Sequence, residues 1–455
     1  MPPADFMKSI QGRADGLIAE YVGASAPGAS LLMTRDGFVY ERAYGYRDAE
    51  NMIPADANTK YMAASITKQF TAAAVVKLAA RGVLSLDDAL SAYFPELPGW
   101  KGSVSIRSLL NHSSGIPDYF DANFLEKYAA GDVQDGDSAA MSVISSYREL
   151  KFAPGTEHMY SNSGYVLLGE IVEKVSGRPF HDFARDELLI PAGMKDSVFL
   201  CSGKRPEGSA KGYSAKPDKR GFAEVPFNRA LAGWADGNLC ATARDLCRWH
   251  EALSASSVLS EYEQERMCSP LVLPDGAKTG AGFGLFIGER RGLREIWHTG
   301  SVPGYASRFS RFPSLPDGGS AAVILLCNAD ISCLDGLGSL FGQIVRILLE
   351  DVMAPVRRSP PERSVLEKIT GRYVSALDGE LMCEVSPEET GIRALGSLRG
   401  FKNGLRAFFA GTKPGSGEAF FYAEDGSDIA MSFTGDSMTV DDVGRTTRLE
   451  RESGG

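Results

Sequence analysis

The sequence predicts an α/β protein in which helices flank one antiparallel sheet, a helical lobe is inserted between two halves of that sheet, and a small antiparallel β-barrel follows. Three observations lead to this prediction. Strand-like runs occur beside helix-like runs near both ends of residues 1–350, the residues between them have mostly helical patterns, and short strand candidates recur through residues 364–455. A sheet built from two distant parts of a chain buries both faces under helices and leaves the middle of the chain as a lobe.

The N-terminal half of the sheet begins with a helix and a hairpin. Apolar residues recur at helical spacing over residues 5–22, which is typical of an amphipathic helix. Two strand-like runs follow at Ser30–Thr34 and Phe38–Tyr44, with Asp36-Gly37 between them. Asp-Gly between apolar runs indicates a tight hairpin, because both turn positions favour positive φ.

The second half of the sheet is expected between residues 280 and 350. Two strand candidates there flank a charged turn, and two more strands and a helix come after them. These elements are Phe283–Ile287, Glu295–His298, the turn at Glu289–Gly292, Tyr305–Phe312, Ala321–Cys327 and the helix Leu337–Val352. Strands from both ends of this region can therefore join one antiparallel sheet.

The chain is long enough for two domains, since it has 455 residues. We expect a catalytic domain over 1–354, a linker rich in Pro and Arg over 355–363, and a lipocalin-like eight-stranded β-barrel domain over 364–455. Eight short strands separated by turn residues fit a small up-and-down barrel. The candidates are 371–376, 380–386, 391–396, 405–410, 418–423, 428–434, 437–441 and 445–450.

Composition excludes several classes of partner. The formal net charge is −10 and no run of Lys or Arg stands out, which argues against nucleic acid or an anionic membrane surface. No apolar run is long enough for a signal peptide or a membrane span. Seven scattered cysteines indicate a reducing, cytoplasmic setting, and a periplasmic or secreted location stays open if a signal has been removed. The five histidines lack metal-ligand spacing, so we expect no metal and no other cofactor.

Ser65 and Lys68 form the only Ser-x-x-Lys in the chain. They open an apolar helical run that continues through Phe70–Leu78 and is closed by Gly82 as a C′ residue. On a helix, Lys68 lies one turn after Ser65 on the same face, so its amine can reach the hydroxyl. The helix N-terminus and other cations favour a neutral, basic amine. A Ser N-cap followed by a chance Lys would give the same motif.

Tyr160 and Asn162 lie on a loop before a second helical run, Gly164–Val175, which Gly177 ends. A phenol can pass a proton to a leaving group, and a carboxamide can orient Lys68 or a substrate carbonyl. Capping of the next helix by Ser or Asn is the alternative explanation of this motif.

His298, Thr299, Gly300 and Ser301 form a third candidate element at the end of a strand. Gly300 allows a substrate backbone to lie close to the strand edge, and the amide of Ser301 can join that of Ser65 in an oxyanion hole. A strand-end histidine with a local hydrogen bond is the alternative for His298. Lys278-Thr279-Gly280 resembles this element in sequence, but it lies in a Gly-rich loop with no strand before it, so we reject it.

In this order and spacing, the three elements resemble the serine β-lactamase-like hydrolases. That family includes class C β-lactamases, D-alanyl-D-alanine carboxypeptidases, D-aminopeptidases and related esterases. The resemblance covers about residues 10–350 and rests also on further segments: Ile106–Ile116, Pro154–Thr156, Tyr160–Tyr165, Leu168-Gly169 and Ala241–Leu246. The chain has no Gly-x-Ser-x-Gly, which argues against an α/β-hydrolase elbow.

The resemblance implies a role for each matching residue. Ser65 is the nucleophile that becomes acylated, and Lys68 is its base. Tyr160 is the acid for the leaving group and the base for deacylation, and Asn162 binds the substrate amide. The backbone amides of Ser65 and Ser301 form the oxyanion hole. His112, inside one of the matching segments, is expected to be structural rather than catalytic.

The substrate expected from this resemblance is a small D-amino-acid peptide, amide or ester. His298 stands where the lactamases have Lys, and carboxypeptidases and D-aminopeptidases of the family commonly have His there. Phe286 and Ile287 stand where carboxypeptidases carry an Arg, although Arg290, Arg291 and Arg308 remain nearby in sequence. A carboxypeptidase, a β-lactamase, an esterase and a penicillin-binding sensor without turnover stay open as alternatives, and so does a homo-oligomer.

Overall fold

The computed structural model describes residues 4–21, 27–129, 136–201, 204–216, 221–227, 235–330, 337–354, 362–375, 382–388, 391–396, 405–412, 419–423, 430–434, 437–442 and 445–451.

Residues from both ends of the expected catalytic region form one six-stranded antiparallel sheet with the order β10-β11-β12-β13-β1-β2. β1 pairs with β13, so that Ala29 lies opposite Cys327. The six strands are β1 (Ala29–Arg35), β2 (Phe38–Tyr44), β10 (Phe286–Arg290), β11 (Leu293–Val302), β12 (Tyr305–Phe312) and β13 (Ala321–Cys327). The prediction that the sheet joins the two ends of this region is confirmed.

The β1–β2 hairpin turns at the dipeptide that the sequence indicated. Asp36 has a φ of 49° and Gly37 a φ of 82°. Both values lie in the left-handed region that a two-residue primed turn requires.

The expected limits of two strands were wrong. β10 begins at Phe286 rather than Phe283 and continues to Arg290, through residues that were expected to form the turn. β11 continues past His298 to Val302. Because β11 pairs with β12 as far as Val302 opposite Tyr305, this polar, Gly-containing segment also adopts a strand conformation. Tertiary hydrogen bonding therefore overrides weak local strand propensity here.

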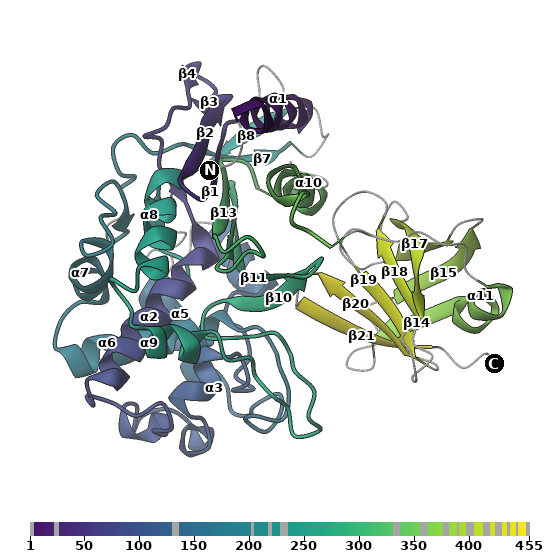
Figure 1. Cartoon of the computed structure of the whole chain (residues 1–455). Coiled ribbons are helices and arrows are strands. Elements are labelled where there is room, and N and C mark those ends of the chain that lie inside the picture. The colour runs from purple at the N-terminus through teal and green to yellow at the C-terminus, as the bar shows by residue number, and fades with distance from the viewer. Residues whose placement is uncertain are drawn as a thin grey trace.

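Helices cover both faces of the sheet (Figure 1). α1 (Ala4–Tyr21) and α10 (Leu337–Leu349) lie on one face, and α8 (Ala243–Ser254) and α2 (Thr67–Ala80) lie on the other. Alternate residues of β13 serve the two faces, since Val323 packs in the cluster of α1 and α10 while Ile324 packs in the cluster of α2. This alternation is the expected result of a strand buried on both sides.

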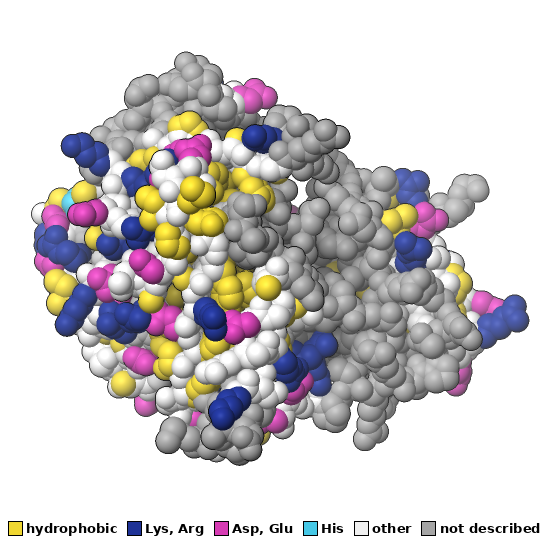
Figure 2. All heavy atoms as spheres, turned by 90° about the horizontal axis from the view of Figure 1, so that it is seen from above, with side chains coloured by type: hydrophobic (Ala, Val, Ile, Leu, Met, Phe, Trp, Pro, Cys, Tyr) yellow, Lys and Arg dark blue, Asp and Glu magenta, His cyan; other side chains and the backbone are white. Residues whose placement is uncertain are grey.

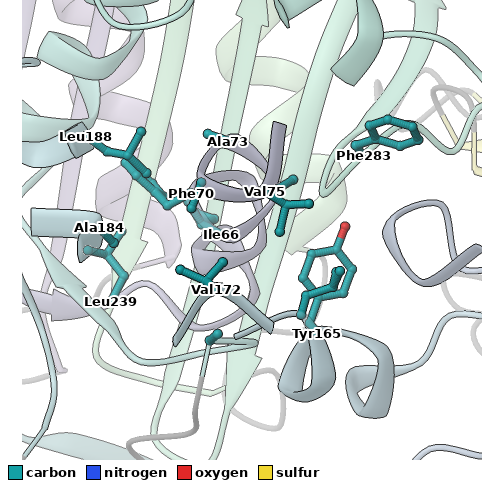
Figure 3. Close-up of a cluster of buried hydrophobic side chains, with 14 of the residues drawn as sticks. Ile66, Phe70, Ala73, Val75, Tyr165, Val172, Ala184, Leu188, Leu239 and Phe283 are labelled. Atoms are coloured by element: carbon teal, nitrogen blue, oxygen red, sulfur yellow. The ribbon is translucent and has the colours of Figure 1, made fainter. Parts of the chain in front are cut away.

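The lobe between the two halves of the sheet is mostly helical. α2 is buried on nearly every side, because the sheet packs against part of it and helices of the lobe pack against the rest. Figure 3 shows side chains of α2 and α6 (Asn162–Ser176) meeting those of Ala184, Leu188 and Leu239. A helix that is apolar all round is stable only in such a core.

Short elements complete this part of the chain. The helical ones are η1 (Ala64–Ile66), η2 (Leu90–Ala92), η3 (Gly99–Gly102), α3 (Ile106–Leu110), α4 (Ala122–Ala129), α5 (Gly136–Ser146), α7 (Phe180–Ala184), the π-helical turn η4 (Arg185–Leu189) and α9 (Glu261–Met267). The strands are β3 (Tyr46–Asp48), β4 (Ile53–Pro54), β5 (Tyr61–Met62), β6 (Val198–Phe199), β7 (Gly212–Ala215), β8 (Phe222–Val225) and β9 (Leu239–Ala241).

After α11 (Arg363–Ile369), eight strands pair in sequence order, and the first pairs with the last to close a ring. Figure 1 draws them in green to yellow. They are β14 (Gly371–Ser375), β15 (Met382–Glu388), β16 (Gly391–Gly396), β17 (Leu405–Thr412), β18 (Ala419–Ala423), β19 (Ala430–Thr434), β20 (Ser437–Asp442) and β21 (Arg445–Arg451). Most of the expected linker, residues 355–361, lies outside the described residues.

The surface in Figure 2 carries acidic and basic side chains interspersed with apolar ones, and no basic patch dominates this face. Within the part of the chain that the structure describes, no helix combines the length and apolarity needed to cross a bilayer.

A buried ion network holds β10, β11 and β12 together. Glu295 contacts Arg290 at 2.6 Å and Arg308 at 3.6 Å, and it accepts a hydrogen bond from Ser310. Burial opposes ionisation of Glu295, but the charges of the two arginines outweigh it and lower the pKa of this carboxyl. Removal of one partner would leave buried charge without compensation.

We therefore expect Glu295→Gln to destabilise the protein by about 3–5 kcal/mol, measured by urea denaturation. Glu350→Gln is the matched control, because Glu350 pairs with Arg13 on the surface. The control should change stability by less than about 1 kcal/mol. Equal effects of the two substitutions would contradict a role for burial in this network.

Candidate active site

Ser65 lies in the 3₁₀ turn η1, directly before α2. Ala64 precedes it with a φ of 50°, a left-handed value that is uncommon for a residue with a side chain. Thr67 fixes the turn, since its Oγ1 donates to Ala64 O at 2.7 Å and accepts from the amide of Leu239 at 2.9 Å. The turn thus presents the half-buried Ser65 at the start of a rigid helix.

Lys68 is completely buried, and its ammonium group meets three oxygen atoms. Nζ lies 3.0 Å from Ser65 Oγ, 2.7 Å from Asn162 Oδ1 and 2.8 Å from the backbone oxygen of Asp236. An ammonium has three protons to donate, so each has an acceptor. The expected contact between Ser65 and Lys68 is therefore present, and Asn162 adjoins the same amine.

Asn162 opens α6, and a carboxylate outside the helix holds it. Asp118 Oδ1 accepts from the backbone N–H of Asn162 at 3.1 Å, and Asp118 Oδ2 accepts from Asn162 Nδ2 at 2.9 Å. Ser161 is the N-cap residue, but its side chain makes no capping bond. Capping by Ser161 therefore does not account for this motif, because Asp118 binds the first amide of the helix instead.

The aromatic ring of Tyr160 lies near Lys68 and two histidines. Lys68 Nζ lies 5.1 Å from the ring centroid, and the rings of His112 and His298 lie 4.4 and 6.0 Å away. The Tyr160 ring is thus close to both the buried amine and His298 on β11.

His112 supports the loop that carries Tyr160. Its Nδ1 accepts the backbone N–H of Ser161 at 3.2 Å, and its backbone oxygen accepts that of Met159 at 2.9 Å. Burial lowers the pKa of His112 well below its usual value, and the nearby charges of His158 and Lys68 lower it further. His112 is therefore neutral at pH 7, which agrees with a structural role.

His298, Thr299, Gly300 and Ser301 lie within β11, beside η1. A Cβ on Gly300 would stand 2.1 Å from Ala63 O and 2.3 Å from Ser307 Oγ. Ser307 lies opposite Gly300 on β12 and donates to the same Ala63 oxygen at 2.8 Å. Gly300 is thus needed for the approach of the chain segment that precedes Ser65, a reason that the sequence did not reveal.

The site segment of β11 has one open edge among the described residues. β10 pairs with β11 only as far as Phe286 opposite Trp297, whereas β12 continues to pair as far as Val302. No strand among the described residues pairs with residues 299–302 on the side away from β12. An extended substrate can pair with such an edge. The backbone oxygen of Thr299 lies 2.5 Å from His298 Nδ1, which is the local hydrogen bond expected under the alternative for this histidine.

Lys278 is exposed and forms an isolated bridge with Val272. Its loop also forms backbone hydrogen bonds, among them one from the Thr279 N–H to the Leu271 oxygen at 3.1 Å.

The three arginines that the sequence left as candidates to bind a substrate carboxylate have other partners. Arg290 and Arg308 belong to the buried network of Glu295, and Arg308 also lies over the rings of Trp297 and Phe341. Arg291 donates to the backbone oxygen of Ala354 at 2.9 Å.

The arrangement brings a hydroxyl, an amine and a carboxamide together and places the ring of Tyr160 beside them. This set can support nucleophilic attack coupled to proton transfer. Sequence reasoning missed Asp118 and Asp236. The acidic residue two positions after the matching segment 106–116 was a possible signal for Asp118, whereas Asp236 contributes a backbone oxygen that no side-chain motif indicates. No group of three or more His, Cys, Asp or Glu residues within the described ranges is arranged to hold a metal ion.

Comparisons with known proteins agree on one family. The family model described as Beta-lactamase matches residues 14–332. Penicillin-binding protein 4* of Bacillus subtilis is 32% identical over 302 residues, which are 63% of this chain and 65% of that protein. D-aminopeptidase of Brucella anthropi is 28% identical over 283 residues, which are 61% of this chain and 52% of that protein. The match thus spans less than two thirds of each relative.

Solved structures show the same fold. The octameric penicillin-binding protein homologue from Pyrococcus abyssi matches with a TM-score of 0.66 and 26% identity. The match covers 97% of this chain and all of that one.

We expect Gly300→Ala to displace β11 from the Ala63 segment, because the new methyl group has no room. A fluorophosphonate that reacts with an activated serine should then label Ser65 about 100-fold more slowly, since small misplacements cost that much. Gly99→Ala is the control, because nothing lies within 4 Å of its Cβ position. Unchanged labelling of Gly300→Ala would show that β11 does not shape the site.

Proposed function

Because this chain belongs to the beta-lactamase family, we propose that it is a serine hydrolase that works through an acyl-enzyme on Ser65. The observation that supports this most directly is the 3.0 Å contact between Lys68 Nζ and Ser65 Oγ at the start of α2. A buried amine within hydrogen-bond reach of a hydroxyl is the arrangement that activates a serine.

In the acylation step, Ser65 Oγ forms a bond to the acyl carbon as its proton passes to Lys68. The amides of Ser65 and Ser301 stabilise the negative charge on the carbonyl oxygen. The bond to the leaving amine or alcohol then breaks, and the leaving group takes a proton from Tyr160. Lys68 returns a proton to Tyr160, so that charge balances.

In deacylation, the water oxygen attacks the ester carbon as Tyr160 accepts a proton from the water and passes its own phenolic proton to Lys68. The bond to Ser65 breaks and its oxygen regains a proton through Lys68. The products are a free carboxylic acid and the unmodified enzyme. Asn162 and the open edge of β11, with His298, Thr299 and Gly300, are proposed to bind the substrate, the carboxamide by a hydrogen bond and the strand by backbone pairing.

The proposed substrates are small D-amino-acid peptides, amides or esters. The D-aminopeptidase relative supports this choice. Engagement of Arg290, Arg291 and Arg308 in other contacts favours it over carboxypeptidase action, which needs a cation for a free carboxylate. Esterase and β-lactamase activity, and acylation without turnover, are the competing outcomes of the assay below.

We further propose a catalytic domain over 1–354, a linker over 355–363 and a separate lipocalin-like barrel domain over 364–455. Pairing of β14–β21 among themselves supports this division. A hydrophobic cluster whose buried members all lie between Ile369 and Leu449 supports it too.

The octameric relative supports a homo-oligomer. Free and mostly buried thiols among the described cysteines support a reducing cytoplasmic setting. In keeping with inert thiols, burial raises the pKa of Cys240 and Cys327 to about 12.

The function is tested by comparing hydrolysis of a D-alanine anilide, a short acyl ester and a chromogenic cephalosporin. We expect the anilide to be hydrolysed and Ser65→Ala to lower its kcat by roughly 10⁴-fold or more. Mass mapping of a fluorophosphonate adduct should locate it on Ser65. Modification of another side chain, or full activity of Ser65→Ala, would refute the proposed nucleophile.

A second comparison tests the choice between the two similar elements. His298→Ala should lower kcat/KM, because His298 lies on β11 beside Tyr160. Lys278→Ala should leave it unchanged, since that side chain is exposed on a separate loop. The reverse result would assign substrate binding to the loop.

A further inference from the structure

Asp118 has a set of contacts that fixes its own orientation. Its Oδ1 accepts two backbone N–H groups, from Asn162 at 3.1 Å and from Phe120 at 3.2 Å. Its Oδ2 accepts from Asn162 Nδ2 at 2.9 Å. The residues on either side are tied to Ser163, which donates to Pro117 O and accepts from the amide of Tyr119. The carboxylate therefore cannot turn easily away from α6.

This contact decides which end of the Asn162 amide faces Lys68. A carboxylate only accepts hydrogen bonds, so the NH₂ group of Asn162 must point to Asp118. The carbonyl oxygen of Asn162 then points to Lys68 Nζ at 2.7 Å. The reversed amide would set two acceptors against each other at Asp118 and place a donor against Lys68.

The orientation matters when Lys68 is neutral and acts as a base. A neutral amine has two protons and one lone pair. The backbone oxygen of Asp236 and the oxygen of Asn162 can only accept, so they bind both protons. The lone pair is then left for Ser65 Oγ, the third neighbour of Nζ, whose hydroxyl can donate its proton.

We propose that Asp118 is a positioning residue that locks the Asn162 amide and so directs the Lys68 lone pair toward Ser65. This inference rests on the proposed serine mechanism and extends it. With a reversed Asn162 amide, the lone pair would accept from the NH₂ group of Asn162, and Lys68 would donate to Ser65 Oγ. Lys68 could then no longer accept the serine proton.

A purely structural role gives a different expectation. Asp118 also binds the first amide of α6, and a helix cap made by Asp is replaced well by Asn and poorly by Ala. If capping were its whole role, both stability and reactivity would be better in Asp118→Asn than in Asp118→Ala.

If Asp118 fixes the orientation of the Asn162 amide, Asp118→Asn should be the more stable of the two variants and the less reactive. In Asp118→Asn, the two backbone donors hold the new side-chain oxygen in place of Oδ1, so its NH₂ group faces that of Asn162. Asn162 must reverse, which directs a donor at Lys68. In Asp118→Ala, the Asn162 amide is free to adopt either orientation.

The experiment measures the rate at which a fluorophosphonate labels Ser65 in the full-length chain, together with the melting temperature. Labelling forms a P–O bond as fluoride leaves and the serine proton passes to Lys68, so it reports activation of Ser65 without a known substrate. We expect labelling to slow about 100-fold in Asp118→Asn, the lower end of general-base effects. In Asp118→Ala it should slow by only about 10-fold, because the Asn162 amide can still adopt the productive orientation part of the time. Asp118→Asn should nevertheless melt at the higher temperature of the two.

The double variant Asp118→Asn with Asn162→Asp provides the rescue. Its carboxylate at position 162 accepts from both Lys68 and the new amide at position 118, so an acceptor faces the amine again. Because this carboxylate also favours the ammonium form of Lys68, labelling should recover at least about tenfold over Asp118→Asn at a pH above that at which the wild-type chain labels best. If Asp118→Asn does not fold, the double variant must still label faster than Asp118→Ala at that pH.

The proposed positioning role of Asp118 would be overturned if Asp118→Asn labelled as fast as Asp118→Ala. It would also be overturned if the double variant showed no recovery of labelling. Failure of the wild-type chain to label at Ser65 would instead refute the proposed function itself, so the two failures can be told apart.

Discussion

The buried ammonium of Lys68 is the constraint on which the rest of the site depends. A charge taken out of water is tolerated only where hydrogen-bond partners replace its hydration. Lys68 obtains these partners from three separate segments: the turn before α2, the first residue of α6 and the backbone at Asp236. These segments must meet at one point for the amine to be buried at all. Burial of Lys68 therefore couples correct folding of the lobe to assembly of the site.

The sheet forms the other wall of the site. Its position is set by the close approach of β11 and β12 to the chain segment that precedes Ser65. Gly300 and Ser307 lie opposite each other on β11 and β12, and both meet Ala63 O two residues before Ser65. On the opposite side of the same strands, Glu295 and its arginines fix the register. One strand thus joins a buried ionic layer to the edge that is proposed to bind the substrate. The precision of the site comes from its position between a packed helix and this braced strand.

The sequence predicted elements well where a single physical signal dominated. β12 and β13 begin and end at the predicted residues, and the Asp36-Gly37 turn has both expected positive φ values. The limits of β10 and the extension of β11 were missed, because pairing with neighbouring strands decided them rather than local propensity. In the site, Ser-x-x-Lys and Tyr-x-Asn revealed side chains with recognisable chemistry. The partners that orient them act through a backbone oxygen at Asp236 and through tertiary contact at Asp118, and neither leaves a periodic pattern.

The pairing of β1 with β13 has a consequence for the time order of folding. Ala29 and Cys327 are neighbours in the sheet although 298 positions separate them in the chain (327 − 29). During synthesis at about 5–20 residues per second, β1 waits roughly 15–60 seconds before its partner strand exists. Such long-range closure is slow and leaves a hydrophobic strand edge exposed while the ribosome completes the chain. The hairpin partner β2 can cover the opposite edge of β1 early, so the edge that pairs with β13 is the one left open until the native sheet closes.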